Sequence, residues 1–476
     1  EMDGKEAGFI FLRQLLSGKV LSFKNVVLVF VPVLNVDGHE RFRAYQRPNQ
    51  NGPLETGWRV TGMNLNLNRD HLKAEDPHMK MLLRFLKNWH PHLTADLHVT
   101  DGAQFEHEIA YIVEPYKEGY APLIRATQDM EEYLLHEVSK KGFSPLNFYP
   151  SFIEYENPLS GVEREISTPR FAQGLARVKN RIGILVETHS WKPFRTRVMA
   201  TLESLVALTE FADKNAERLR EATQGADREA ASLAGKTYVL DYSLSKESIP
   251  YSMRGYHFER PLSVITGKPV TVYDPSKNEV WNIQLYNHPT VAVETTVPHQ
   301  GYFVMPSAAQ ALVEERLILH GISYQKLKKA RPALKVETFE VSEHTFAPKS
   351  YEGRQTLSLK GAWKSTQVNI PVNTLFVPIA VAQAPLIMNL LEPQAPDSLA
   401  AWGYLNAYME QKEGIEGYVI EPFAQEKLRD PAIRQAFESF KKDASNANNP
   451  DKLIQFFHKM HPSWDENYRR IPIYRL

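Results

Sequence analysis

The sequence predicts an α/β domain over residues 1–222, followed by a smaller α+β domain over 236–476. In the first part, short apolar runs alternate with amphipathic, helix-like segments, which is typical of α/β folds. In the second part, short alternating runs broken by Pro and Gly take their place. With 476 residues, the chain is too long for one ordinary hydrophobic core, so two domains are expected. The polar stretch 223–235 suits the boundary between them.

The first elements follow from periodicity and from stop signals. An apolar stripe over 3–16 predicts a helix, and Gly18 is its expected end. The run 25–34 is continuously apolar and predicts a strand buried on both faces, as in a parallel sheet. A turn is expected at 35–38, where the chain reads Asn-Val-Asp-Gly. The alternation at 64–70 predicts a short extended piece with polar side chains on one face.

Later elements are predicted in the same way. Region 141–180 contains four prolines and is expected to be a loop. In the second domain, we expect helices at 307–320, 397–411 and 422–457 among short strands. The remaining elements of the first domain are helices at 77–89, 121–138 and from 193 to about 221, and strands at 92–98, 109–113 and 182–187.

The composition narrows the class of function. Lys+Arg and Asp+Glu both number 56, so the net charge gives no reason to expect nucleic acid or an anionic membrane as a partner. No apolar run approaches the ~20 residues that span a bilayer. Without cysteine, thiol catalysis and Cys-ligated zinc are excluded. The oligomeric state and the compartment stay open, with a periplasmic or secreted location favoured over the cytoplasm.

Three residues are candidates for metal chemistry: Glu1, His98 and Glu187. A zinc hydrolase needs two or three His or carboxylate ligands and a further carboxylate that acts on water. His98 ends a predicted strand, where α/β enzymes gather ligands. Glu187 also ends an apolar strand, where burial would raise the carboxyl pKa and suit a general base. The structural alternative is that Glu187 only caps its strand and pairs with an Arg.

Four motifs in the first 200 residues follow one another as in the zinc carboxypeptidases, the carboxypeptidase A-like family, which this part of the chain resembles. They are Asn-Val-Asp-Gly at 35–38, Asn-Leu-Asn-Arg at 66–69, Asp-Leu-His at 96–98 and Leu-Val-Glu at 185–187. The resemblance implies a mixed, mostly parallel sheet flanked by helices, Zn²⁺ as cofactor, and a peptide or protein C-terminus as substrate. The sequence departs from the family at Val36, where the family usually has Pro.

The resemblance also implies which residues hold the metal and act on water. Glu1 matches the second ligand of a His-x-x-Glu motif, so the first ligand, a His, is expected three positions before it, outside this sequence. His98 matches the third zinc ligand, and Glu187 matches the general base. Either His39 or His71 is a further candidate to complete the metal site.

Other residues would contact the substrate. Asn68 and Arg69 match the pair that holds the substrate carboxylate, which the planar fork of an Arg binds through two hydrogen bonds. Arg47 would polarise the scissile carbonyl because it precedes that pair, and Arg59 is the alternative. Both arginines could equally belong to a solvated loop. The family also has a tyrosine on the substrate side of the site. The sequence offers Tyr149 and Tyr155 as candidates for it and does not decide between them.

The sequence therefore predicts a zinc-dependent carboxypeptidase with a C-terminal domain of unassigned role. One alternative is a zinc-dependent deacylase of N-acyl amino acids, of the succinylglutamate desuccinylase/aspartoacylase type. The other is a binding module whose metal site has decayed. Side-chain preference and the natural substrate do not follow from the residues.

Overall fold

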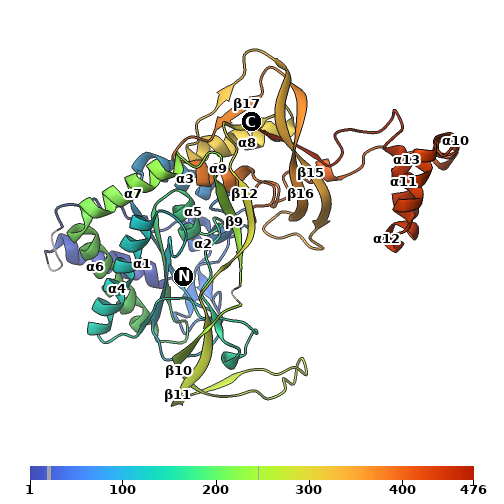
Figure 1. Cartoon of the computed structure of the whole chain (residues 1–476). Coiled ribbons are helices and arrows are strands. Elements are labelled where there is room, and N and C mark those ends of the chain that lie inside the picture. Colours follow the sequence, from blue (N-terminus) through green and yellow to red (C-terminus); the bar gives the residue numbers. More distant parts are fainter. Residues whose placement is uncertain (19–22, 245) are drawn as a thin grey trace.

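The computed structural model describes residues 1–18, 23–244 and 246–476. A mixed sheet with strand order β3-β8-β4-β5 forms the centre of the first half, with helices on both faces (Figure 1). β8 pairs in parallel with β3 and antiparallel with β4, and β4 pairs in parallel with β5. This confirms the predicted class, a mixed sheet flanked by helices. The strands are β3 (Leu93–Val99), β4 (Ile109–Glu114), β5 (Pro145–Leu146) and β8 (Ile182–Thr188).

Alternate residues of β8 face two layers of helices. Ile182, Ile184 and Val186 pack against α4 and α6 in one apolar cluster. On the opposite face, α5 approaches so closely that a Cβ at Gly183 would lie 2.5 Å from the Cα of Gln173. Only glycine fits this contact. The helices of this half are α1 (Asp3–Leu16), α2 (Val36–Glu40), α3 (Pro77–Trp89), α4 (Ala121–Lys140), α5 (Ala172–Val178), α6 (Phe194–Lys214) and α7 (Ala216–Ala230).

The apolar run at 25–34 is not a strand, and this prediction was wrong. No ladder pairs it with another strand among the described residues, and Val27 is 78% exposed. An apolar run favours burial, but a strand also requires a partner strand. β3 pairs with β8 on one side only within the described chain.

Several boundaries also differ from the prediction. Segment 64–70 is a turn that contains the short 3₁₀ helix η1 (Leu67–Arg69) rather than an extended piece. The expected loop region 141–180 contains α5 as well as short strands. The long helix after Pro193 is two helices that meet at Asn215. The short strands are β1 (Arg43–Ala44), β2 (Glu55–Thr56), β6 (Ser151–Phe152) and β7 (Val162–Glu163), with the 3₁₀ helix η2 (Pro158–Ser160) before β7.

A six-stranded antiparallel sheet, in the order β14-β17-β13-β18-β15-β16, dominates the second half, which spans 236–476 and is no smaller than the first. Its largest pairing is the hairpin of β15 and β16. No helix forms at 397–411 beyond a 3₁₀ turn, contrary to the prediction. The elements are β13 (Gly301–Val304), α8 (Ala308–His320), β14 (Gln325–Lys326), β15 (Arg331–Phe346), β16 (Leu357–Ile370), β17 (Leu375–Pro378), α9 (Ala384–Leu391), η3 (Asn406–Met409) and β18 (Arg470–Arg475).

The two halves share contacts. One apolar core joins Met79 and Leu83 of α3 to Val313 and Leu317 of α8. β11 pairs in parallel with β7, so strands of the second half also extend a sheet of the first. The predicted domain division at 222 and 236 stays a prediction. The strands of this part of the chain are β9 (Thr237–Ser243), β10 (Ile249–Glu259), β11 (Val272–Tyr286) and β12 (Thr290–Thr296). β10 and β11 belong to the sheet that contains β7, whereas β9 and β12 pair with each other.

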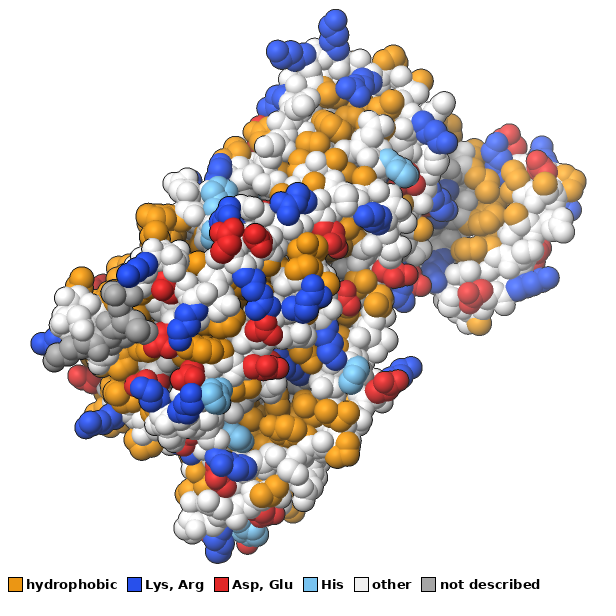
Figure 2. Space-filling model, turned by 60° about the vertical axis from the view of Figure 1, so that its left-hand side comes forward, with side chains coloured by type: hydrophobic (Ala, Val, Ile, Leu, Met, Phe, Trp, Pro, Cys, Tyr) orange, Lys and Arg blue, Asp and Glu red, His pale blue; other side chains and the backbone are white. Residues whose placement is uncertain are grey.

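A helical unit stands away from the rest of the molecule between η3 and β18 (Figure 1). It has its own small apolar cluster around Ile420, Ala424 and Phe457. Lys and Arg are interspersed with Asp and Glu over the face shown in Figure 2. Among the described residues, no helix is both long and apolar enough to cross a membrane. The unit consists of α10 (Gly417–Lys427), α11 (Pro431–Lys441), α12 (Ala444–Ala447) and α13 (Pro450–His458).

Candidate active site

His98 lies between two carboxylates at the end of β3. Its Nδ1 is 3.0 Å from Glu1 Oε2, and its Nε2 is 3.0 Å from Asp96 Oδ2. Glu1 Oε2 also accepts a hydrogen bond of 3.1 Å from the backbone amide of Val99. Two residues that the sequence singled out, Glu1 and His98, are therefore in contact although they lie far apart in the chain.

Local structure explains this arrangement. Side chains two positions apart in a strand point to the same face, so β3 presents Asp96 and His98 together. Glu1 is placed by the start of α1, where Asp3 accepts hydrogen bonds of 2.7 Å from Thr188 at the end of β8 and from the buried Arg197. The Asp3–Arg197 pair thus fixes the first helix against the end of the sheet.

Glu187 stands beside this cluster on the neighbouring strand. It is the register partner of His98, and partner side chains of adjacent strands point to the same face. The residue is 8% exposed, and its Oε2 is buried without a hydrogen-bond partner among the described residues. Burial raises the pKa of Glu187 well above its usual range. The positive charge of His98 opposes this effect, and the negative charges of Glu1 and Asp96 add to it. Such a carboxyl group can exchange a proton near neutral pH.

The charges around His98 favour a cation. Burial alone would lower the pKa of His98, but Asp96 and Glu1 outweigh it and raise that pKa well above its usual range. Burial likewise opposes ionisation of Glu1, yet the charge and hydrogen bond of His98 hold its pKa below the usual range, and Arg47 adds to this effect. Without a metal ion the ring is therefore protonated, and a bound metal ion would take the place of that proton.

The structure separates the candidate arginines. Arg47 Nη1 donates a hydrogen bond of 2.9 Å to Glu1 Oε1, and its Nε is buried without a partner in the described chain. Arg59 is exposed and lines the same cavity as Glu1 and His98. The geometry therefore brings Arg47 into contact with the cluster, whereas Arg59 lies at the rim.

The two residues of the predicted carboxylate anchor have different surroundings. Asn68 lines the cavity with Glu1 and His98, and its buried Oδ1 has no partner among the described residues. Arg69 is not among the cavity-lining residues. Its guanidinium packs on Phe171, 4.7 Å from the ring centroid, and its Nε donates to the hydroxyl of Tyr351.

The two candidate tyrosines also differ. Tyr149 is partly buried and donates a hydrogen bond of 3.4 Å to the carbonyl oxygen of Asp101. Burial raises the pKa of Tyr149, and the negative charge of Glu187 raises it further, which places the phenol near that carboxylate. Tyr155 is 88% exposed. Tyr149 is therefore the tyrosine beside the cluster.

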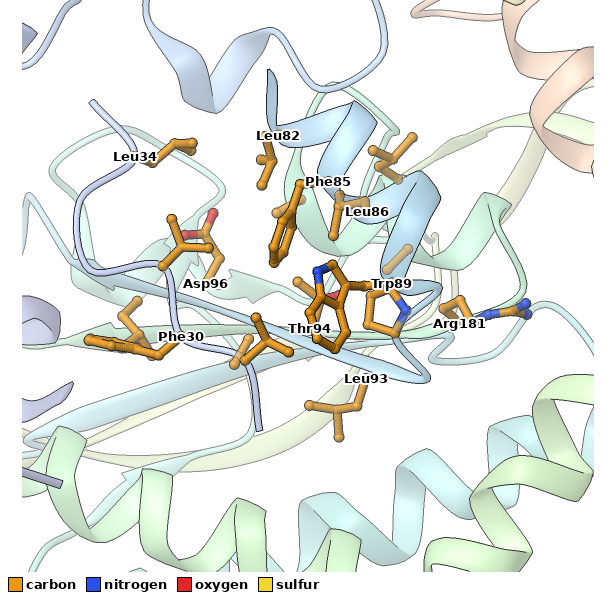
Figure 3. A pocket seen from close by; sticks show the side chains of 18 of the residues that line it. Phe30, Leu34, Leu82, Phe85, Leu86, Trp89, Leu93, Thr94, Asp96 and Arg181 are labelled. Carbon is orange, nitrogen blue, oxygen red and sulfur yellow. The ribbon is translucent and has the colours of Figure 1, made fainter. Parts of the chain in front are cut away.

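A large cleft opens from this cluster along β3 (Figure 3). Its volume is about 1680 Å³, more than the ~300–1,000 Å³ usual for small-molecule sites. Phe30 and Leu34 of the 25–34 run line one wall, and Phe85 and Trp89 of α3 line the other. Charged side chains, among them Arg181, Asp213 and Arg220, also line the cleft away from Asp96.

The donor set fits part of a zinc site. A carboxylate oxygen and an imidazole nitrogen converge, and Asp96 holds the other ring nitrogen, as second carboxylates do for metal-bound histidines. Catalytic zinc sites usually offer three protein ligands. Among residues 1–18, 23–244 and 246–476, no group of three or more His, Cys, Asp or Glu is placed to hold a metal ion. Glu1 and His98 together offer two donor groups, which is fewer than a catalytic zinc site usually has.

Neither additional histidine completes the set. His71 is buried, its Nδ1 has no partner among the described residues, and burial lowers its pKa to about 4. His39 Nδ1 lies 3.1 Å from the Nζ of Lys5. Both line the cleft, yet neither joins Glu1 and His98 in a group of three.

One member of the cluster was missed as a functional residue. Asp96 was recognised only as part of the Asp-Leu-His motif, although the strand alternation already placed it on the face of His98. Tyr149 had no decisive sequence signal, because the fold of region 141–180 brings it to the cluster.

Comparison with known proteins gives distant likenesses only. No family model matches the chain, and no curated protein matches it. Two solved structures come from Shewanella amazonensis SB2B and Shewanella denitrificans OS217, and both proteins are provisionally named metallopeptidases. The first is 19% identical to this chain with a TM-score of 0.30, and the match covers 44% of this chain and 71% of that one. The second is 18% identical with a TM-score of 0.29, and the match covers 44% of this chain and 69% of that one. A metallo-carboxypeptidase of Burkholderia cenocepacia shares 12% identity over 39% of this chain and 44% of its own, with a TM-score of 0.28. Likenesses at this level carry no activity over to this chain.

Proposed function

We propose that this chain is a metal-dependent peptidase of the carboxypeptidase type, with Zn²⁺ as the metal. The carrying observation is the partly buried cluster in which Glu1 and Asp96 flank His98, while Glu187 is buried on the next strand with no partner for its Oε2 in the described chain. It combines two metal-ligand side chains with a separate carboxyl group that can move a proton. The family resemblance of the first 200 residues supports the same chemistry.

Each residue then has a distinct role. Glu1 and His98 would hold the metal, and Asp96 would fix the tautomer and orientation of the His98 ring. Zinc, when bound, supplies Lewis acidity that lowers the pKa of water and polarises a carbonyl group. Glu187 accepts the proton of the attacking water and delivers it to the leaving amine nitrogen. These transfers balance: one water is consumed, and one carboxylic acid and one amine are formed.

The substrate contacts follow from the cationic side chains. Arg47 stabilises the negative charge that develops on the carbonyl oxygen, because it already lies in the cluster with donors to spare. Asn68 and Arg69 bind the terminal carboxylate of the peptide. This contact selects a chain end over an internal peptide bond.

A comparison of three substrates tests the proposal. The full chain, supplied with Zn²⁺, should release the C-terminal residue of a free-acid peptide faster than it cleaves the matching peptide amide. It should leave an N-acyl amino acid largely intact. Preference for the N-acyl amino acid would instead assign the deacylase chemistry. No turnover of any of the three, with zinc bound, would identify a binding module.

Glu187→Gln tests the proton-transfer role. The amide keeps size and polarity but cannot accept the proton, so kcat should fall roughly 10²-fold or more while bound zinc, measured by elemental analysis, stays the same. The matched control is Glu114→Gln, a buried carboxyl group of the same sheet that accepts hydrogen bonds from the backbone amides of Tyr116 and Ser167. That variant should lose stability and keep its kcat. An unchanged kcat in Glu187→Gln would refute the assignment.

A further inference from the structure

The loop between β15 and β16 reaches from the second half of the chain to the segment that carries Asn68 and Arg69. Tyr351 accepts a hydrogen bond of 2.9 Å from Arg69 Nε, and Glu352 accepts one of 2.8 Å from the backbone amide of Asn66. Arg354 donates a hydrogen bond of 2.7 Å to Glu75. Three residues of one loop therefore bind the chain before, at and after the predicted carboxylate anchor.

The loop is built to be rigid. Tyr351 and Arg354 exchange two backbone hydrogen bonds, of 2.8 and 3.0 Å, around a two-residue turn. The turn residues have positive φ angles, 50° at Glu352 and 75° at Gly353, as a tight hairpin of this type requires. The ring of Tyr351 stacks on the buried Trp402 at a centroid distance of 6.1 Å and an angle of 8°. The Tyr351 hydroxyl is thus held at a fixed position.

Arg69 is held on three sides by this arrangement. Its Nε donates to Tyr351, its Nη1 donates to the carbonyl oxygen of Asn68 at 2.7 Å, and its face packs on Phe171. A guanidinium has five N–H donors, so these two hydrogen bonds leave three, all on the terminal nitrogens. The terminal nitrogens form the edge that binds a carboxylate through two parallel hydrogen bonds.

We propose that Tyr351 is a positioning residue for substrate recognition, through which the second domain completes the site for the terminal carboxylate of a peptide. This inference rests on the proposed function and gives the second domain a role in it. By occupying Nε, the Tyr351 hydroxyl fixes the rotation of the guanidinium and leaves three donors on its two terminal nitrogens for a carboxylate. Since Tyr351 acts on Arg69 rather than on the reacting atoms, it affects binding of free-acid peptides and not the chemical step.

Tyr351→Phe in the full chain with Zn²⁺ tests this inference. It removes only the hydroxyl and keeps the ring on Trp402. We expect KM for a free-acid peptide to rise roughly 3- to 10-fold, which is the size expected for losing one typical hydrogen bond, while kcat stays within about twofold. The parameters for the matching peptide amide should not change, because it has no terminal carboxylate.

Two controls separate positioning from general structure. Tyr324→Phe removes another hydroxyl of the second half, which donates a hydrogen bond of 2.8 Å to Glu314 within that half. Lys80→Gln breaks the ion pair between α3 and α8, where Lys80 Nζ lies 2.6 Å from Glu315 Oε1, and so loosens the contact of the two halves elsewhere. Both should leave the ratio of KM values for free acid and amide unchanged.

The outcomes are distinct for the two proposals. If Tyr351→Phe changes KM for acid and amide equally, or for neither, Tyr351 is not a positioning residue, whereas the peptidase assignment stands on wild-type turnover. If the wild type binds the free-acid peptide without cleaving it, the proposed function is overturned, and the same variant comparison decides this inference through Kd measured by calorimetry. A wild type with no preference for the free acid over the amide overturns both.

Discussion

Two apolar runs of similar composition have different structures in this molecule. β8, Ile182–Thr188, is buried along its whole length between β3 and β4. The run at 25–34 is as apolar in sequence, yet its valines are exposed to differing degrees and it joins no sheet within the described chain. Both runs end at residues of interest, Glu187 in one case and the Asn-Val-Asp-Gly turn in the other.

The difference shows what an apolar run does and does not determine. β8 has a strand on each side and helices over both faces, so its backbone pairs in two ladders and its apolar side chains are covered. Among its side chains, Glu187 keeps Oε2 without a hydrogen-bond partner in the described chain. The 25–34 run has its side chains on the wall of the cleft, across from β3, with Phe30 packed on α1 at Phe9 and Gly8. Residue type therefore indicates a preference for burial, and the available neighbours decide whether a strand forms.

The largest difference between the two runs should appear in amide hydrogen exchange. The central amides of β8 exchange only when the sheet opens, whereas no backbone amide of 26–34 donates a hydrogen bond within the described chain. We expect exchange on the order of 10³-fold slower or more in β8, because global opening costs at least ~5 kcal/mol. Mass spectrometry of peptides that cover both runs measures the two exchange rates, with β4 as the internal reference. Equal protection would mean that 25–34 forms a ladder in solution.

Side-chain truncation should separate the runs next. Ile184 is 1% exposed between α4 and α6, so Ile184→Ala should lower the free energy of unfolding by about 2–5 kcal/mol through lost burial and a cavity. Chemical denaturation measures this change in the free energy of unfolding, provided that the m value is the same in the variant and the wild type. Ile318→Ala on α8, where the side chain is half exposed, is the matched control and should cost far less. A loss under about 1 kcal/mol at Ile184 would show that β8 is not the rigid centre.

The sequence predicted the fold best where one segment carries its own signal. The helices at α1, α3 and α4 and the strands β3, β4 and β8 have a clear period or a clear apolar run, and their ends fall within a few residues of the prediction. It failed where pairing depends on distant parts. β18 pairs with β13 and β15 only after the intervening α10–α13 unit, and nothing local specifies that choice.

The same limit applies to the candidate site. Asp96 and His98 share a face through strand alternation, which the sequence contains, and their contact with Glu1 depends on where α1 docks. The contact between Arg69 and Tyr351 joins two halves of the chain and has no local signal. The roles of Glu1, His98, Glu187, Asn68 and Arg69 remain predictions until the kinetic tests are made.

Val27→Ala should have the smallest effect on the free energy of unfolding, and it tests directly whether the 25–34 run is exposed in solution. A valine that is 78% exposed has little surface left to lose, so the free energy of unfolding should change by no more than about 0.5 kcal/mol. Val186→Ala in β8 removes the same atoms from a fully buried position and should cost several times as much. A loss at Val27 approaching that at Val186 would mean that the run is covered in solution. The cleft beside β3 would then be filled by polypeptide, and the two runs would be equivalent strands after all.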